Sequence, residues 1–84
     1  MTHQAGKWRF DVTLDHEPRR TRAQIVLRTP EGAEFSGVGL AHRGGAARVA
    51  GYLALGRAMS DLTEELLEAA MVELEVEADR VWSS

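Results

Sequence analysis

One continuous amphipathic segment near the C-terminus constrains this chain more than any other feature. It reads "YLALGRAMSDLTEELLEAAMVELEVEADR", from Tyr52 to Arg80, and its apolar residues recur every three or four positions. That spacing places them on one stripe of an α-helix, with carboxylates on the other side. The sequence therefore predicts one long helix. The stripe comprises Leu55, Met59, Leu62, Leu66, Ala70 and Leu74, and it is widened by Leu67 and Met71.

Gly56 lies inside this segment, where glycine costs a helix about 1 kcal/mol relative to alanine. It either allows close packing on a neighbouring sheet or marks a joint between two helical pieces. Asp61 and Glu64 have the spacing of an N-terminal capping pair and would suit a helix that restarts there. We predict a single continuous helix.

The residues before the helix alternate between apolar and polar with period two. This pattern runs from Trp8 to Leu14 and again from Arg22 to Arg28, and it is typical of half-buried strands. The stretches "DHEPRR" and "TPEG" form turns, and Gly32 suits a backbone position with positive φ. Short connections join antiparallel strands. We therefore predict an α+β fold, a three-stranded antiparallel meander with the long C-terminal helix on one face.

The third strand contains "FSGVGLAH", in which Gly37 and Gly39 stand two apart. A phosphate-binding loop is excluded because the third glycine and the Gly-Lys-Ser/Thr continuation are missing, and because the pair lies within a strand pattern. Glycine in a strand instead allows a bulge, a sharp bend or close approach of another backbone. A bulge near Gly37 would turn both Phe35 and Val38 inward.

These elements form one domain over residues 1–84, with flexible ends at 1–6 and 81–84. A core of this size rarely supplies more than roughly 3–5 kcal/mol. The chain has no cysteine, so disulfides and cysteine-bound zinc are excluded, and we expect a homodimer. Gly37 and Gly39 are expected to be structural. The predicted core comprises Trp8, Phe10, Val12, Leu14, Ile25, Leu27, Phe35, Leu55, Met59, Leu62 and Leu66.

Charge is divided unevenly along the chain. Residues 1–57 carry nine basic and five acidic groups, whereas residues 58–84 carry one basic and eight acidic groups. On the predicted strands the basic groups share the solvent side, so they form either a surface for nucleic acid or a partner surface for acidic helices of a second subunit. The candidate binding residues are Lys7, Arg9, Arg19, Arg20, Arg22, Arg28, Arg43 and Arg48.

Catalytic and metal-binding patterns are missing from the sequence. His3 falls in the N-terminal tail, His42 ends the third strand, and His16 stands in a turn between Asp15 and Glu17. One imidazole flanked by two carboxylates makes a weak metal site without further ligands. Each serine lacks a histidine and carboxylate placed by a motif. We therefore expect no enzymatic activity, no catalytic residue, no metal, no cofactor and no small-molecule substrate.

Five short motifs are spread along the chain: Trp8 with Asp15-His16, Thr21-Arg22-Ala23, Gly37-Val38-Gly39-Leu40-Ala41, Arg57-Ala58 and Ser60-Asp61-Leu62. Together they resemble a small actinobacterial family of unknown function with a double-stranded-RNA-binding-domain-like fold. The resemblance covers roughly residues 7–75. It implies a β3-α module that lacks the first helix of the true RNA-binding domain. Family members are compared in shape with ribosome hibernation factors, and some form homodimers.

Two departures limit what the resemblance implies for function. The family's longer loop after the third strand, which contains "NPAD", is replaced here by the shorter "HRGGAARVAG". True double-stranded-RNA binders also place lysines at the start of the last helix, where this chain has Arg43, Arg48 and Arg57. The acidic helix that follows would be repelled by a polyanion.

Taken together, these patterns predict a non-catalytic, homodimeric binding module. The leading hypothesis is association with ribosomes or RNA under stress or in dormancy. The alternative is a protein-protein interaction module that uses the acidic helix or the dimer surface and binds no nucleic acid. Without a signal peptide or an apolar run of about 20 residues, the chain is expected to be cytoplasmic and not bound to membranes.

Overall fold

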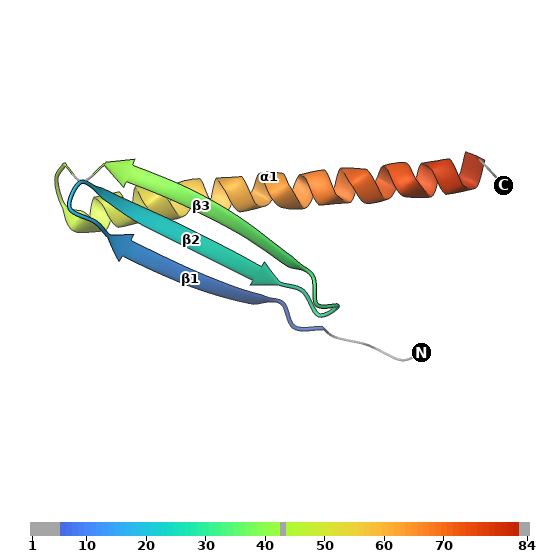
Figure 1. Ribbon diagram of the computed structural model, residues 1–84, viewed down its shortest axis with the longest axis horizontal. Helices are drawn as coiled ribbons and strands as arrows, with labels where there is room; N and C mark the ends of the chain where they lie inside the picture. Colours follow the sequence, from blue (N-terminus) through green and yellow to red (C-terminus); the bar gives the residue numbers. More distant parts are fainter. Residues whose placement is uncertain (1–5, 43, 83–84) are drawn as a thin grey trace.

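A computed structural model describes residues 6–42 and 44–82, and it contains three strands followed by one helix. The strands β1 (Arg9–His16), β2 (Arg20–Arg28) and β3 (Glu34–His42) form an antiparallel sheet in the order β1-β2-β3. The helix α1 (Ala47–Trp82) runs over one face of this sheet and continues well past it (Figure 1). The predicted α+β class and the three-stranded meander with one long helix are confirmed.

The turn between β2 and β3 closes as the sequence "TPEG" predicts. Gly32 has a φ of 91°, a left-handed conformation that glycine adopts without steric cost. Thr29 N donates to Ala33 O over 2.9 Å, and Ala33 N donates to the Thr29 side-chain Oγ1 over 3.0 Å. These bonds fix the register in which β3 returns along β2.

The helix is continuous over its 36 residues, so Gly56 does not mark a joint. Gly56 is exposed, and a Cβ added there would meet nothing within 4 Å. The alternative of close packing on the sheet at Gly56 is therefore wrong as well.

Close packing occurs instead at the two glycines of β3. A Cβ at Gly37 would collide with the backbone oxygen of Ala58 and lie 2.7 Å from Leu62 N, and one at Gly39 would collide with the backbone of Ala54 and Ala58. The backbones of β3 and α1 are thus in contact. No bulge is needed, since Gln24 pairs with Val38 and Ile25 with Gly37 in an unbroken ladder. Val38 therefore faces away from the helix, contrary to the expected bulge.

The core is small and consists mainly of short side chains. Among the described residues, eight apolar side chains are buried in the core. Five of them are alanines, and the large ones are Ile25, Leu27 and Leu62. Phe35, Leu55 and Leu66 are partly buried against them.

Five residues expected in the core are exposed. Phe10, Val12 and Leu14 do point to the helix side, because they pair with Leu27, Ile25 and Ala23, but the helix does not reach them. A helix about 10–12 Å wide covers roughly two strands spaced at about 4.8 Å. Here those strands are β2 and β3. The exposed residues are Trp8, Phe10, Val12, Leu14 and Met59.

Some predictions fall partly or wholly outside the described residues. His3 and Arg43 lie there, as do residues 1–5 and 83–84 of the ends that we expected to be flexible. Val81 and Trp82, which belong to the expected flexible C-terminus, form the last turn of α1.

Candidate functional site

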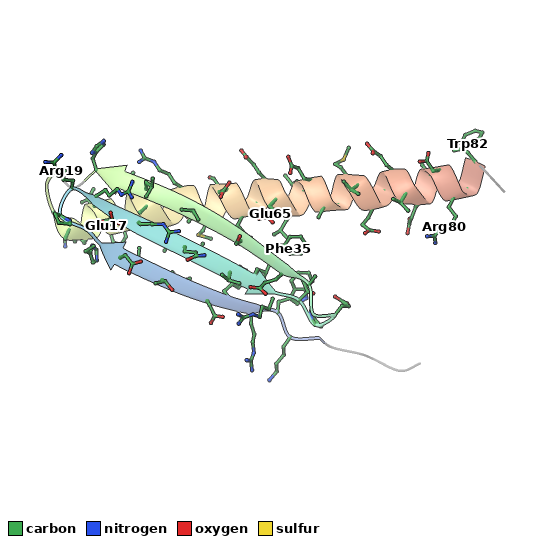
Figure 2. The ribbon with its side chains drawn as sticks, viewed as in Figure 1. Glu17, Arg19, Phe35, Glu65, Arg80 and Trp82 are labelled. Atoms are coloured by element: carbon green, nitrogen blue, oxygen red, sulfur yellow. The ribbon has the colours of Figure 1, made fainter. Side chains whose placement is uncertain are left out.

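The predicted basic residues do not form one cluster in the structure. Arg9, Arg22 and Arg28 share the outer face of the sheet, opposite the face that α1 covers. Lys7 lies two residues before β1, and Arg20 begins β2. Arg19 lies in the turn between these strands, at the end of the molecule where α1 begins (Figure 2). Arg48, in contrast, lies on α1 and lines a pocket on the inner side of the sheet beside Leu14.

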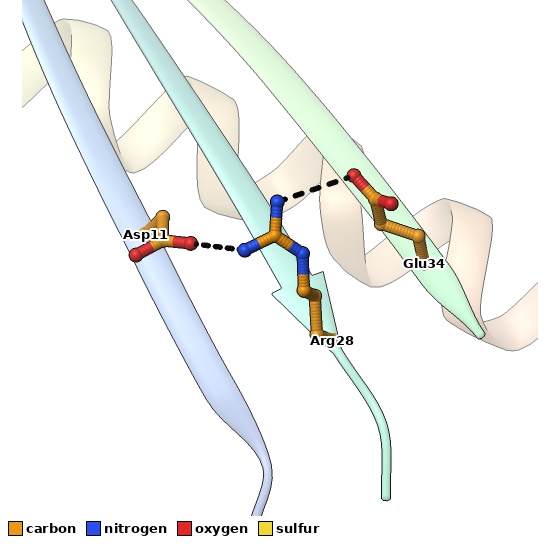
Figure 3. A network of polar contacts seen from close by, with 3 residues as sticks. All are labelled: Asp11, Arg28 and Glu34. Atoms are coloured by element: carbon orange, nitrogen blue, oxygen red, sulfur yellow. Dashed lines mark hydrogen bonds and ion pairs between the residues drawn. The ribbon is translucent and has the colours of Figure 1, made fainter. Parts of the chain in front are cut away.

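Carboxylates offset much of the charge on this outer face. Arg28 Nη1 donates to Asp11 Oδ2 over 2.9 Å, and its Nη2 lies 3.9 Å from Glu34 Oε1, so one arginine bridges all three strands (Figure 3). Arg20 Nε pairs with Glu17 Oε2 at 2.8 Å. Arg22 stands opposite Asp15 in the β1–β2 ladder. The outer face is therefore a mixture of both signs of charge.

Side chains of α1 form hydrogen bonds with main-chain groups along the edge of β3 that faces away from β2. Ser36 N donates to Glu65 Oε2 over 3.1 Å, and Val38 N donates to Asp61 Oδ2 over 2.9 Å. Arg57 Nη1 donates to the carbonyl oxygen of Leu40 over 2.6 Å. These bonds occupy main-chain groups that an incoming strand would otherwise use.

Sequence reasoning missed these three helix residues as a functional set. Arg57, Asp61 and Glu65 recur every four positions, which places them on one flank of the helix. That spacing is the signal that was available. It could not show that the flank lies along a strand edge, because the path of α1 across the sheet is decided by packing.

The inner face of β1 is uncovered and apolar. Phe10 is 59% exposed, Val12 50% and Leu14 40%, although all three point to the same side as the buried residues of β2. Trp8 precedes them and is also more than half exposed. We refer to Trp8, Phe10, Val12 and Leu14 as the β1 apolar row. A contiguous apolar surface of this kind on a small protein indicates an interaction site.

A pocket of about 260 Å³ lies beside the β1 apolar row. Leu14 and His16 form its β1 side, and Gly51, Tyr52 and Leu55 are among the residues of α1 that line it. Tyr52 is 72% exposed at its rim. The pocket therefore continues the apolar surface from β1 onto the adjacent flank of α1.

The C-terminal part of the helix extends beyond the sheet, with Arg80 and Trp82 near its far end (Figure 2). Every described residue after Ala69 is exposed. We call residues 67–82 the α1 extension. It carries five acidic residues and one basic residue, Arg80. Its apolar residues at alternating spacings of four and three, which form one stripe of a helix, are Leu67, Met71, Leu74, Ala78 and Val81.

The histidine expected in a turn belongs to β1. His16 is its last residue, and its ring Nδ1 lies 3.2 Å from the buried hydroxyl of Thr21 on β2. In the part of the chain that the structure describes, no three histidine or carboxylate side chains gather in a group that could hold a metal ion. Across residues 6–42 and 44–82, α1 included, no helix has the apolar length that a bilayer span requires.

These features define a small α+β protein with an open sheet, a single long helix and two uncovered apolar surfaces. Its sequence matches the model of the Rv2632c-like family over residues 6–81, and the chain belongs to that family. The match agrees with the expected membership of a small family of unknown function. A comparison with curated proteins found no match.

Proposed function

We propose that the protein is a non-catalytic, homodimeric binding module of the cytoplasm that docks onto a protein partner through the α1 extension. The observation that carries this proposal is the extension itself, sixteen residues of helix that leave the sheet and keep an apolar stripe exposed. In proteins most of the stability of a helix comes from packing of an amphipathic face, and Leu67, Met71 and Leu74 of this stripe are exposed. A partner that covers Leu67, Met71 and Leu74 would supply that packing.

Charge favours a protein over a nucleic acid as this partner. The five acidic residues of the extension would repel a phosphate backbone. Amphipathic helices bind proteins by laying their apolar side into a hydrophobic groove, with charged residues at the rim. The partner expected here presents an apolar groove edged by lysine or arginine.

The small core supports the homodimer. Among the described residues, only Ile25, Leu27 and Leu62 are large, apolar and buried, which is little for a domain of this size. The accessible surface is 6921 Å², whereas a compact monomer of 9.2 kDa exposes about 4,900 Å². A second subunit would remove part of this excess from water.

A pull-down with the tagged full chain tests the proposal. We expect one dominant protein to be retained after nuclease treatment, to be lost with the double variant Leu67→Asp/Met71→Asp, and to be released at high salt. The matched control is Val49→Asp, an exposed apolar residue of the same helix over the sheet. Retention by the double variant, or equal loss with Val49→Asp, would contradict docking through the extension.

A second candidate function is association with ribosomes or RNA under stress. Arg9 and Arg22 support it, since both lie on the outer face and neither forms an ion pair within the described residues. The dsRBD-like shape implied by the family resemblance, with its comparison to ribosome hibernation factors, also motivates it. Phosphate contacts would make the binding strongly salt-dependent.

Co-sedimentation with ribosomes at rising salt tests this second candidate. Charge reversal of Arg9, Arg22 and Arg28 should abolish sedimentation if the outer face makes the contact. Sedimentation that is unaffected by both the salt and the reversal would remove its basis.

A further inference from the structure

We infer that a second copy of this chain pairs edge to edge with β1, so that β1 lies antiparallel to its own copy in the register centred on Val12. This inference rests on the homodimer of the proposed function and names its interface. The dimer sheet would have six strands, with both helices on one face. The two-fold axis sends the two α1 extensions to opposite ends, where each remains open to a partner.

The two edges of the sheet differ in a way that selects β1. Helix side chains occupy main-chain groups of β3 at Ser36, Val38 and Leu40. Among the described residues, β1 pairs with β2 on one side, and no element lies along its other side (Figure 1). An open strand edge is a template for another strand.

Side-chain parity restricts the register. Residues that face each other across an antiparallel pair lie on the same face of the sheet, so only pairings that keep the β1 apolar row on the inner face are allowed. The registers that pair the most residues of β1 with their copies are centred on Val12 or Thr13, and those centred on Asp11 or Leu14 pair fewer. Centring on Asp11 sets two aspartates directly opposite each other, and centring on Thr13 sets Asp11 opposite Asp15 of the second copy. Like charges in these positions are destabilising.

Centring on Val12 removes both conflicts and creates complementary pairs. Arg9 then stands opposite Asp15 of the second copy on the outer face, and symmetry repeats the pair. On the inner face Val12 meets Val12, and Phe10 meets Leu14. Opposite charges and apolar side chains in such cross-strand positions stabilise a sheet.

In the register centred on Val12, Phe10 of the second copy would occupy the pocket beside Leu14. Leu14 lines the pocket of about 260 Å³ between β1 and α1, and Phe10 of the second copy would be its cross-strand neighbour. A cavity of about 150 Å³ is enough to hold a benzene molecule. The aromatic ring of Phe10 therefore fits beside Leu14, and Leu55 and Tyr52 would cover it from α1.

Single cysteines test the register directly, because the natural chain has none. With Val12→Cys, the two thiols would lie opposite each other with Cα atoms about 4.5–5.5 Å apart, within reach of a disulfide. The matched controls are Asp11→Cys and Thr13→Cys. Each would be two residues out of register with its copy, with Cα atoms about 7–8 Å apart, which is too far for a disulfide. Under mild oxidation we expect near-complete cross-linking for Val12→Cys and little for either control.

Sedimentation equilibrium on folded variants tests the surface itself. Phe10→Asp should weaken dimerisation by at least about 100-fold, because it places a charge in the apolar interface. Leu67→Asp should leave the dimer intact. Arg9→Asp should weaken it roughly tenfold, and Arg9→Asp/Asp15→Arg should recover most of that loss. Circular dichroism checks that each variant keeps its fold.

The outcomes separate this inference from the proposed function. Cross-linking of Val12→Cys alone supports it, and preferential cross-linking of Asp11→Cys or Thr13→Cys overturns the register. A dimer by mass that none of the cysteines cross-links overturns edge pairing but leaves the homodimer standing. A monomeric wild-type protein overturns both the edge pairing and the homodimer, while docking through the α1 extension is still decided by the pull-down with Leu67→Asp/Met71→Asp.

Discussion

The two edge strands of the sheet have opposite surroundings although both are apolar on the same face. β3 lies under the helix, with Gly37 and Gly39 in backbone contact with it and with carboxylates of α1 bonded along its edge. β1 has larger side chains on that face, and they remain exposed. On β3 the small residues let the helix approach closely, whereas the large residues of β1 are not covered by any other described residues.

The width of a helix explains why one strand of the sheet is left uncovered. One helix covers about two strands, so an odd third strand must be left bare or be covered by a partner. In this chain the bare strand carries Trp8, Phe10, Val12 and Leu14, which are among its largest apolar side chains. The covered half stabilises the monomer, and the uncovered half is available for binding.

The largest expected effect is at the covered edge. Gly39→Ala should destabilise the fold by about 3 kcal/mol or more, because the new Cβ would collide with the backbone of Ala54 and Ala58. Urea denaturation followed by circular dichroism measures the free energy of unfolding. The control is Gly56→Ala, which meets nothing and should stabilise the helix by about 0.5–1 kcal/mol. Equal effects of the two substitutions would contradict the close approach.

The second prediction compares a buried and an exposed residue that pair with each other in the β1–β2 ladder. Ile25→Ala should cost about 2–4 kcal/mol, since Ile25 is 2% exposed. Its ladder partner Val12 is half exposed, so Val12→Ala should cost less than about 1 kcal/mol in the monomeric Phe10→Asp background. Thermal unfolding of both variants checks the difference. If Val12→Ala cost as much as Ile25→Ala in that background, β1 would be covered within the monomer.

A smaller effect is expected from the side chains that close the β3 edge. Asp61→Ala removes the acceptor of Val38 N and should cost about 1 kcal/mol. The control Glu64→Ala, at an exposed position on the same helix, should change the free energy of unfolding by less than about 0.5 kcal/mol. Hydrogen exchange of the Val38 amide should also accelerate in Asp61→Ala alone. Unchanged exchange would show that the carboxylate does not protect this edge.

The smallest effect is expected on the outer face. Arg28→Ala breaks the pairs with Asp11 and Glu34, but all three side chains are more than half exposed. Its cost should be below about 0.5 kcal/mol, and it should vanish near 1 M salt. Denaturation at low and high salt measures this difference. A cost above about 1 kcal/mol that persisted in salt would mean that the bridge across the strands is structural.

Particular residues show which predictions the sequence could support. The alternation around Ile25 and Leu27 identified the inner face, and the spacing of Leu55, Leu62 and Leu66 identified the helix stripe. The same alternation in β1 also identified the inner face correctly. Periodicity could not show that Phe10 on β1 and Met59 on α1 would be left exposed, because it reports which side a residue points to and not what covers that side.

The basic residues show the same limit for the candidate site. Parity placed Arg9, Arg22 and Arg28 on one face, as the ladder has them. The pairing of Arg28 with carboxylates of both neighbouring strands depends on register, which sequence spacing does not specify. The same holds for Asp61 and Glu65, whose bonds to β3 join residues more than 20 positions apart in the chain.

The sequence by itself determined the kinds of element, their order and the apolar side of each, because these depend on local periodicity and on turn residues. Tertiary structure alone decided which strands the helix covers. The helix could either pack its backbone closely on Gly37 and Gly39 of β3 or bury the larger side chains of β1, and the structure has the first arrangement. At Gly37 and Gly39 the strand has no Cβ, so the backbone of the helix lies against the backbone of the strand, an approach that the larger side chains of β1 do not allow.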